Sequence, residues 1–415
     1  MDKFLKILVS IGAVLVTAGA ARAQLNNEAF TGSRSSQPKY SYPSINPTGG
    51  NETVFDSLKQ AKPRLLVEET ANAGDLRLAI SAFTFFKDNE YFNKIVDGYT
   101  LSGTQLNPQF VYYPTKDLRL EAGIFLWKDF GNPTLQQVRP TYRATWTVKN
   151  HQFIFGNIRP HLNHNYIEPL FNFERVMLKP LEEGVQYRYL NDRLFVDVWV
   201  DWQRQQYRFS NFQEEIAGGL SSSYHFTGRQ NPWQVVVPFQ FTATHHGGQI
   251  DTLNKPLQTL FNEAVGLEAR RSMGTSIKAL RLNAYALGFQ DHSFTAGQFP
   301  FKNGTALYLN GTIETKYGDA MLSYFEGEHF IAPLGGDLYQ GFSRTVSDPT
   351  YTETVRRVLL LRLLRDFRIS DAATLTVRVE PVYDFRGRKT DFSFGFYLNF
   401  RQEWLLGNVG SRVRQ

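Results

Sequence analysis

The chain has 415 residues, a formal net charge of +6 at pH 7 and no cysteine. The lack of cysteine excludes a disulfide framework and any zinc or iron–sulfur site with cysteine ligands. The small basic excess does not favour a nucleic-acid partner. Phe and Tyr, with 34 and 20 residues, far outnumber the 4 Met, and this aromatic bias favours strands over helices.

The first 23 residues have the pattern of an export signal. Lys3 and Lys6 precede an apolar stretch over 7–20, and Ala21-Arg22-Ala23 matches a small-x-small cleavage site. An N-terminal membrane anchor is the alternative, but the apolar stretch is short for a span. We therefore expect a cleaved signal peptide over 1–23 and a secreted mature chain.

The rest of the chain divides into an arm, a long series of strand-like runs and a tail. Residues 24–75 are rich in Ser, Asn, Pro and Gly, which predicts a periplasmic N-terminal arm able to dock a periplasmic partner. About sixteen runs of roughly 10–12 residues follow, the length of a tilted membrane strand. They lie near 76–86, 103–113, 117–128, 137–148, 151–159, 184–190, 193–203, 214–227, 232–245, 261–271, 275–289, 304–316, 319–329, 352–367, 373–385 and 391–401.

Short and long connections alternate between these runs. Tight turns such as 149–150, 191–192 and 317–319 alternate with longer loops such as 160–183, 246–260 and 330–351. Tight periplasmic turns and long external loops are typical of outer-membrane barrels. No later segment reaches the roughly 18 apolar residues of a membrane helix, so a membrane form of this chain must be a barrel.

Residues alternate between polar and apolar along individual runs. In 194–202 the even positions are apolar, whereas Asp197 and Asp201 share the other face; 375–380 alternates in the same way. One face suits lipid and the other a polar lumen. The sequence therefore predicts an all-β, closed, antiparallel transmembrane β-barrel of about 16 strands over 76–401.

At this point the chain resembles the bacterial outer-membrane β-barrels of porin size. The last run resembles their assembly signal at Ser393, Gly395, Leu398 and Phe400. The resemblance implies a Gram-negative outer membrane, contact with its lipid bilayer and assembly machinery, and compatibility with an oligomer. Such barrels usually end at the final aromatic residue, so residues 402–415 are expected to form a periplasmic C-terminal tail.

The strand faces predict which charged residues line the lumen. An ion-paired interior that braces the wall and a polar channel with a slight preference for anions are both open interpretations. The predicted lining residues are Arg77, Arg119, Glu121, Arg139, Arg143, Arg188, Asp197, Asp201, Arg270, Arg281, Arg362, Arg378 and Glu380.

The third long loop is the candidate constriction. In sixteen-stranded porins the corresponding loop folds into the barrel, and this resemblance implies that Glu168 and Glu174 face Arg139 and Arg143. An ordinary surface loop is the alternative. The loop residues singled out are His161, His164, Glu168, Glu174 and Arg175. The pair His161 and His164 has no carboxylate at fixed spacing, so neither a metal site nor another cofactor is expected.

These patterns favour an outer-membrane channel for small polar, anionic solutes. An exporter of an anionic polysaccharide and a non-conducting barrel with a structural or assembly role are the alternatives. Enzymatic activity is not expected. The histidines near hydroxyls are His225, at the periplasmic end of its run, and the pair His245 and His246, interpreted as a tight turn at the outer rim.

Overall fold

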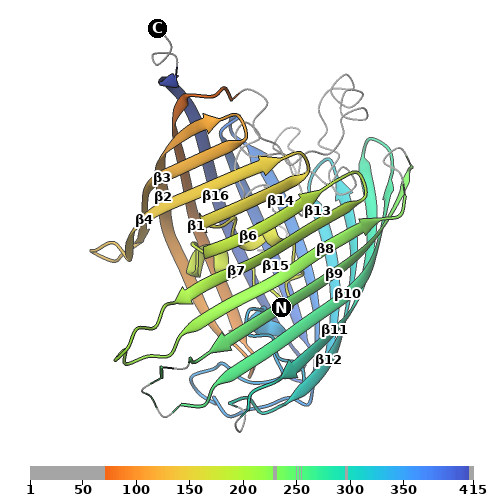
Figure 1. Ribbon diagram of the computed structural model, residues 1–415. Coiled ribbons are helices and arrows are strands. Elements are labelled where there is room, and N and C mark those ends of the chain that lie inside the picture. The colour runs from red at the N-terminus through yellow and green to blue at the C-terminus, as the bar shows by residue number, and fades with distance from the viewer. Residues whose placement is uncertain are drawn as a thin grey trace.

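The computed structural model describes residues 71–410, apart from 228–230, 249, 252, 254 and 295–297. In this part of the chain, sixteen strands form one closed antiparallel barrel (Figure 1), which confirms the predicted fold class. The predicted signal peptide and nearly all of the N-terminal arm lie outside the described residues. The strands are β1 (Asp75–Phe92), β2 (Asp97–Thr115), β3 (Leu118–Asp129), β4 (Gln137–Val148), β5 (His151–Asn157), β6 (Glu183–Leu190), β7 (Leu194–Arg204), β8 (Glu215–His225), β9 (Trp233–His246), β10 (Gln258–Ser272), β11 (Ile277–Asp291), β12 (Asn303–Thr315), β13 (Asp319–Glu328), β14 (Val355–Arg368), β15 (Ala373–Asp384) and β16 (Lys389–Asn408).

The first and last strands close the barrel. Each strand pairs with its neighbours in sequence, and β1 pairs with β16 from Asp75 opposite Asn408 to Glu90 opposite Phe392. Closure removes the exposed edges whose backbone groups would lack partners in lipid. Residues 402–408, which the sequence assigned to the tail, therefore belong to the barrel because they pair with the beginning of β1.

The wall is apolar outside and polar inside. On β10 the side chains of Val265 and Leu267 are more than half exposed on the outer face, whereas Asn262 and Arg270 are buried on the inner face. This alternation is that of a strand between lipid and a polar lumen. No helix among the described residues is long and apolar enough to cross a membrane.

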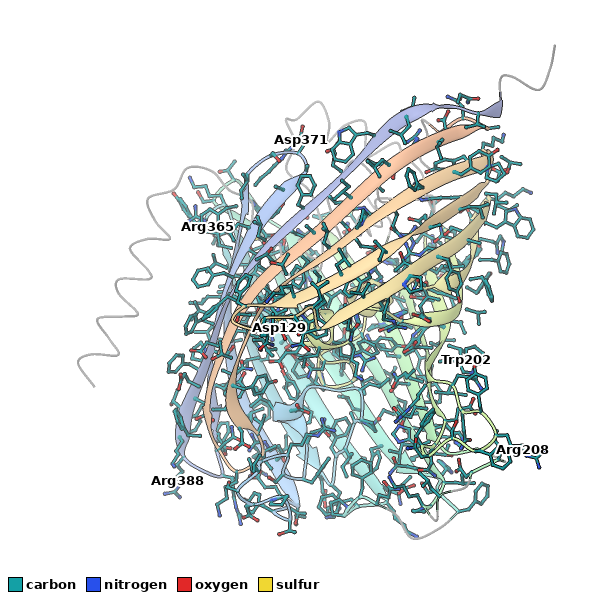
Figure 2. The ribbon with its side chains drawn as sticks, turned by 90° about the vertical axis from the view of Figure 1, so that its left-hand side faces the viewer. Asp129, Trp202, Arg208, Arg365, Asp371 and Arg388 are labelled. Atoms are coloured by element: carbon teal, nitrogen blue, oxygen red, sulfur yellow. The ribbon has the colours of Figure 1, made fainter. Side chains whose placement is uncertain are left out.

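The two ends of the barrel differ as the sequence predicted. The termini of the described chain and the tight turns lie at one end, and the longer connections lie at the other (Figure 1). Arg208 and Arg388 mark the end with the longer connections, and Asp371 marks the opposite end (Figure 2). By the topology typical of such barrels, we expect the first of these ends to face outward from the cell.

The residues of the predicted assembly signal all lie on β16. Ser393 is buried on the inner face, and Leu398 is partly exposed on the outer face. At Gly395 a Cβ atom would lie 2.3 Å from the Tyr397 hydroxyl oxygen, so glycine leaves room for this ring against the wall. Recognition of these residues during assembly remains a prediction.

Two long connections fold into the lumen. The inner loop, residues 158–182, contains η1 (His161–His164) and α4 (Arg175–Leu178); the second connection, residues 329–354, contains η2 (Asp337–Tyr339). The backbone N–H of Asn172 in the inner loop donates to the carbonyl oxygen of Leu334 at 2.7 Å. Apolar residues of both connections pack with wall residues in buried clusters, so the core lies inside the barrel.

The topology predicts which single cysteines react with a reagent that cannot cross the membrane. The chain has no native cysteine. In intact cells we expect Ser210→Cys, in the β7–β8 loop, to be labelled, and Asn150→Cys, in the β4–β5 turn, to be labelled only after permeabilisation. Gel shift with a polyethylene glycol maleimide measures both. Labelling of Asn150→Cys from outside would reverse the orientation.

Candidate active site

The predicted lumen charges form ion pairs inside the wall. Each of the nine arginines predicted to face the lumen lies within 4.0 Å of a carboxylate oxygen. The pairs are Arg77 with Asp75, Arg119 and Arg143 with Glu121, Arg139 with Glu183, Arg188 with Asp197, Arg270 and Arg281 with Glu314, and Arg362 and Arg378 with Glu380. Asp201 accepts the backbone N–H of Glu183 at 2.8 Å. This arrangement is that of the ion-paired interior, because an unpartnered buried charge is costly.

The inner loop does not place its carboxylates opposite Arg139 and Arg143, and that prediction is wrong. Glu174 instead binds Lys87, and its Oε1 accepts the Asn89 side-chain amide at 2.9 Å. Glu168 binds Arg362 on β14. The loop crosses the lumen to other parts of the wall. Arg143 pairs with Glu121 on β3, and Arg139 pairs with Glu183, the first residue of β6.

One buried histidine anchors the inner loop to the wall. His164 Nε2 lies 2.8 Å from Glu182, and its Nδ1 lies 3.0 Å from Asp197 on β7. Its ring stacks on Trp199 at 4.5 Å between centroids. His161 Nδ1 and an Arg175 guanidinium nitrogen contact Glu182 at 3.1 and 3.8 Å. Three of the predicted loop residues, His161, His164 and Arg175, thus form a buried anchor around Glu182.

A polar cluster on the outer wall interrupts the apolar exterior. At the outer end of β9 and β10, His245 and Thr259 lie directly opposite each other on the lipid-facing side. His245 Nδ1 lies 2.9 Å from Thr259 Oγ1. An imidazole hydrogen-bonded to a hydroxyl can accept its proton, which is the requirement for activating an oxygen nucleophile.

The chain beyond β11 folds back onto Thr259. The backbone N–H of His292 donates to the Thr259 carbonyl oxygen at 2.9 Å, and the Thr259 N–H donates to Ser293 Oγ at 3.1 Å. Ser293 is held in turn by its own N–H, which donates to Asp291 Oδ1 at 2.9 Å. A second imidazole and a second hydroxyl therefore lie beside the His245–Thr259 pair.

A polar relay connects this second imidazole to a carboxylate. His292 Nε2 lies 2.9 Å from Gln290 Oε1, and Gln290 Nε2 donates to Glu263 Oε1 at 3.2 Å. The His292 ring packs against Phe261 at 4.9 Å between centroids. We call the residues His245, Thr259, Glu263, Gln290, His292 and Ser293 the outer-rim cluster.

Sequence reasoning noticed His245 but interpreted it as part of a tight turn. Thr259 was missed because the predicted run for β10 began at 261. Gln290 and Ser293 were missed because the predicted run for β11 ended at 289. A signal was present: odd positions of β9 face lipid, so a histidine at an odd position near the outer end stands out. His225, by contrast, is buried at the periplasmic end of β8.

Among the described residues, no group of three or more His, Asp or Glu side chains is placed to hold a metal ion.

The closed sixteen-stranded wall and its apolar exterior define an outer-membrane β-barrel of porin size. The model of the lipid A 3'-O-deacylase-type family matches residues 68–409, and the chain belongs to this family. The expectation that the protein is not an enzyme is overturned by this match, since the family is named for a deacylase activity. No curated protein matches the chain.

Several solved outer-membrane proteins resemble the barrel. A loop L8 deletion mutant of OmpT of Vibrio cholerae is 13% identical, with a TM-score of 0.48 and coverage of 80% of this chain and 100% of that one. OprD of Pseudomonas aeruginosa is 9% identical, with a TM-score of 0.48 and coverage of 82% and 97%. OccK2 of Pseudomonas aeruginosa, solved with glucuronate, is 8% identical, with a TM-score of 0.48 and coverage of 81% and 100%. At these identities the likeness carries no inference about a shared ligand.

The His164 anchor predicts a loss of stability at high pH. Burial disfavours the charged ring, but Asp197 and Glu182 outweigh burial and raise the pKa of His164 to about 9. Because this pKa exceeds the usual value of about 6.5, the anchor stabilises fully below pH 6.5 and weakens as pH rises through 9. Urea unfolding in detergent micelles at pH 6, 8 and 10 measures this decline.

The variant His164→Leu provides the comparison. It removes the one cation that contacts both Glu182 and Asp197 within 3.0 Å, so we expect a loss of about 3 kcal/mol at pH 6. The remaining stability should change less between pH 6 and 10 than that of the wild type. Equal pH dependence in both proteins would exclude His164 as the cause.

Proposed function

We propose that this protein is an outer-membrane hydrolase that removes an ester-linked acyl chain from an acylated glycolipid of the lipid A class. The observation that carries the proposal is the 2.9 Å contact between His245 Nδ1 and Thr259 Oγ1 on the lipid-facing wall. Membership of the lipid A 3'-O-deacylase-type family supports it. The location fits the substrate, because an ester near the headgroups of the outer leaflet lies at the depth of the outer ends of the strands.

The chemistry begins at the Thr259 hydroxyl. His245 accepts its proton as Thr259 Oγ1 attacks the ester carbonyl carbon, and the Ser293 hydroxyl is placed to donate to the carbonyl oxygen. Collapse of the tetrahedral intermediate breaks the bond to the sugar oxygen, which takes the proton from His245. Water, deprotonated by His245, then cleaves the acyl-threonine, releasing the fatty acid and restoring the Thr259 hydroxyl.

The wall also offers a place for the acyl chain. A hollow on the outer face of β10–β14 is lined by Leu267, Leu282, Ala284, Leu309 and Leu322, with little polar surface. Along β10, Leu267 lies eight residues from Thr259, about 26 Å along the tilted strand toward the membrane centre. An acyl chain that extends from an ester at the outer-rim cluster toward the membrane centre would run in the direction of this hollow.

The His245–Thr259 pair predicts the effect of two single substitutions. With purified protein in detergent and lipid A as substrate, we expect His245→Gln and Thr259→Val each to reduce fatty-acid release by about 100-fold or more. Mass spectrometry of the released acid measures the rate. The matched controls are His246→Gln and Thr242→Val, whose side chains are on the lumen side of the same strand β9. Rates within about threefold of wild type for both cluster variants would refute the assignment.

Filling the hollow predicts a selective loss on long acyl chains. We expect Ala284→Trp to slow release of long-chain acids by about tenfold while leaving hydrolysis of a short-chain soluble ester unchanged. Ala144→Trp is the control, because Ala144 lines a similar apolar hollow over β4–β7. If Ala284→Trp slows both substrates equally, or neither, the hollow does not hold the chain.

A channel for small anionic solutes is the second candidate function. The observation that favours it is the charged interior of a porin-sized barrel, in which nine arginines face inward. Planar-bilayer conductance with the reversal potential in a salt gradient tests it. Steps with anion preference support a channel, and a silent barrel removes this candidate without affecting the hydrolase.

A further inference from the structure

The β7–β8 loop, residues 205–214, leaves the barrel at its outer end and extends beside the wall (Figure 2). Trp202, on the outer face near the end of β7, has an exposed fraction of 43%. Tryptophan at an outward-facing position near a strand end marks the level of the lipid headgroups. In Figure 2, Arg208 lies farther from the barrel wall than Trp202, so the loop extends over the membrane surface and not over the lumen.

The outermost turn of this loop exposes two aromatic rings with a cation between them. Tyr207 and Phe209 are 70% and 79% exposed, and Arg208 is exposed as well. The Arg208 guanidinium lies 5.2 Å from the centre of the Phe209 ring. An apolar ring beside a basic group suits the membrane interface, where the ring contacts the upper acyl chains and the cation contacts headgroup phosphates. We call residues 207–210 the outer tip.

Two hydrogen bonds hold the outer tip in a tight turn. The Ser210 N–H donates to the Tyr207 carbonyl oxygen at 3.0 Å, and the Tyr207 N–H donates to Ser210 Oγ at 3.0 Å. Phe209 adopts a left-handed backbone with a φ of 73°. This conformation is unfavourable for an aromatic residue, whereas glycine and asparagine adopt it readily. Because backbone strain of this kind is concentrated at functional sites, an exposed phenylalanine here indicates a role beyond folding.

The base of the loop is fixed to the wall that carries the outer-rim cluster. Gln206, which is 4% exposed, donates through Nε2 to Asp251 Oδ1 at 2.7 Å, and Gln213 Nε2 donates to Asp251 Oδ2 at 3.0 Å. Asp251 belongs to the β9–β10 connection. On the adjoining strands, Ile216 of β8 lies opposite His245 of β9. The outer tip is therefore held at a fixed place relative to the cluster.

We infer that the outer tip docks on the lipid surface of the outer leaflet. Tyr207 and Phe209 insert their rings at the boundary between headgroups and acyl chains, and Arg208 contacts a phosphate of a lipid headgroup. The headgroup level is hydrated, so Ser210 there stays within reach of an aqueous reagent. Docking makes and breaks no covalent bond, so the inference goes beyond the proposed hydrolase and does not depend on it.

Fluorine NMR of the mature protein in lipid nanodiscs tests the docking. A fluorinated phenylalanine at position 209 keeps the ring, and the same amino acid in place of Asp371 reports on an exposed turn at the opposite end (Figure 2). A lipid with a nitroxide near the first acyl carbons should relax the signal from position 209 more than that from position 371. A gadolinium chelate in water should do the reverse. Equal relaxation of both positions by both agents would overturn the inference.

Two charge variants test the phosphate contact. Discs of phosphatidylcholine with phosphatidylglycerol should hold the outer tip more tightly than discs of phosphatidylcholine alone. In the anionic discs, Arg208→Gln should lower the docking equilibrium constant by about fivefold, the share of one basic residue near an anionic surface. Arg193→Gln is the matched control, because Arg193 is exposed in the β6–β7 turn at the opposite end, and it should dock like the wild type. Equal docking of both variants in both kinds of disc would exclude the Arg208 contact.

The variant Phe209→Asn separates docking from folding. Asparagine adopts the left-handed backbone readily, so this variant should keep or raise the thermal unfolding temperature in detergent. With fluorotyrosine at position 207 as the probe, it should reduce relaxation by the lipid nitroxide, because one of the two inserted rings is lost. A lower unfolding temperature with unchanged relaxation would assign Phe209 a structural role and overturn the inference. His245→Gln should dock like the wild type, which separates this result from a failure of the hydrolase proposal.

Discussion

Pairing of every backbone polar group across a closed wall is the constraint on which the rest of this structure depends. Lipid offers no partner for an unpaired N–H or C=O, so a sheet in the membrane must close. Here β1 pairs with β16 along nearly its whole length, and β16 extends to Asn408 for that purpose. Closure fixes the faces of all strands at once: one set of side chains contacts lipid and the other fills the lumen.

The lumen face in turn requires charge compensation. Arginines on neighbouring strands share carboxylates, and Glu168, Glu174 and Glu182 of the inner loop complete the pairs inside the barrel. The loop is thus held across the lumen by ion pairs and by apolar packing together.

The exterior shows a different exception. Between the strand ends the lipid-facing positions of β9 are apolar, and His245, Thr259 and Glu263 are polar at the outer ends of β9 and β10. Polar side chains on a lipid-facing surface lower the stability of the barrel. Local departures from the pattern of a fold are expected at functional sites. This argument and the family membership both support the proposed hydrolysis at the outer-rim cluster.

Individual residues illustrate what could be predicted. The period-2 pattern placed Arg270 and Glu380 in the lumen correctly, because a strand between lipid and water has only two faces. The same pattern ends where polar residues replace apolar ones at a strand end. The predicted runs therefore stopped at 289 and began at 261, although β11 continues to Asp291 and β10 begins at Gln258. Thr259 and Gln290 were lost to the loops for this reason.

The sequence by itself determined the all-β class, a barrel of about sixteen strands, the alternation of turns and loops, and the alternation of lipid-facing and lumen-facing positions within the runs. These features follow from local periodicity and chain length. Only the tertiary structure decided that Thr259 lies opposite His245, that Glu174 reaches Lys87, and that Arg143, Arg159 and Arg401 share one cavity. Such contacts depend on strand register and on the path of the inner loop across the lumen, and both are set by packing between residues far apart in the chain.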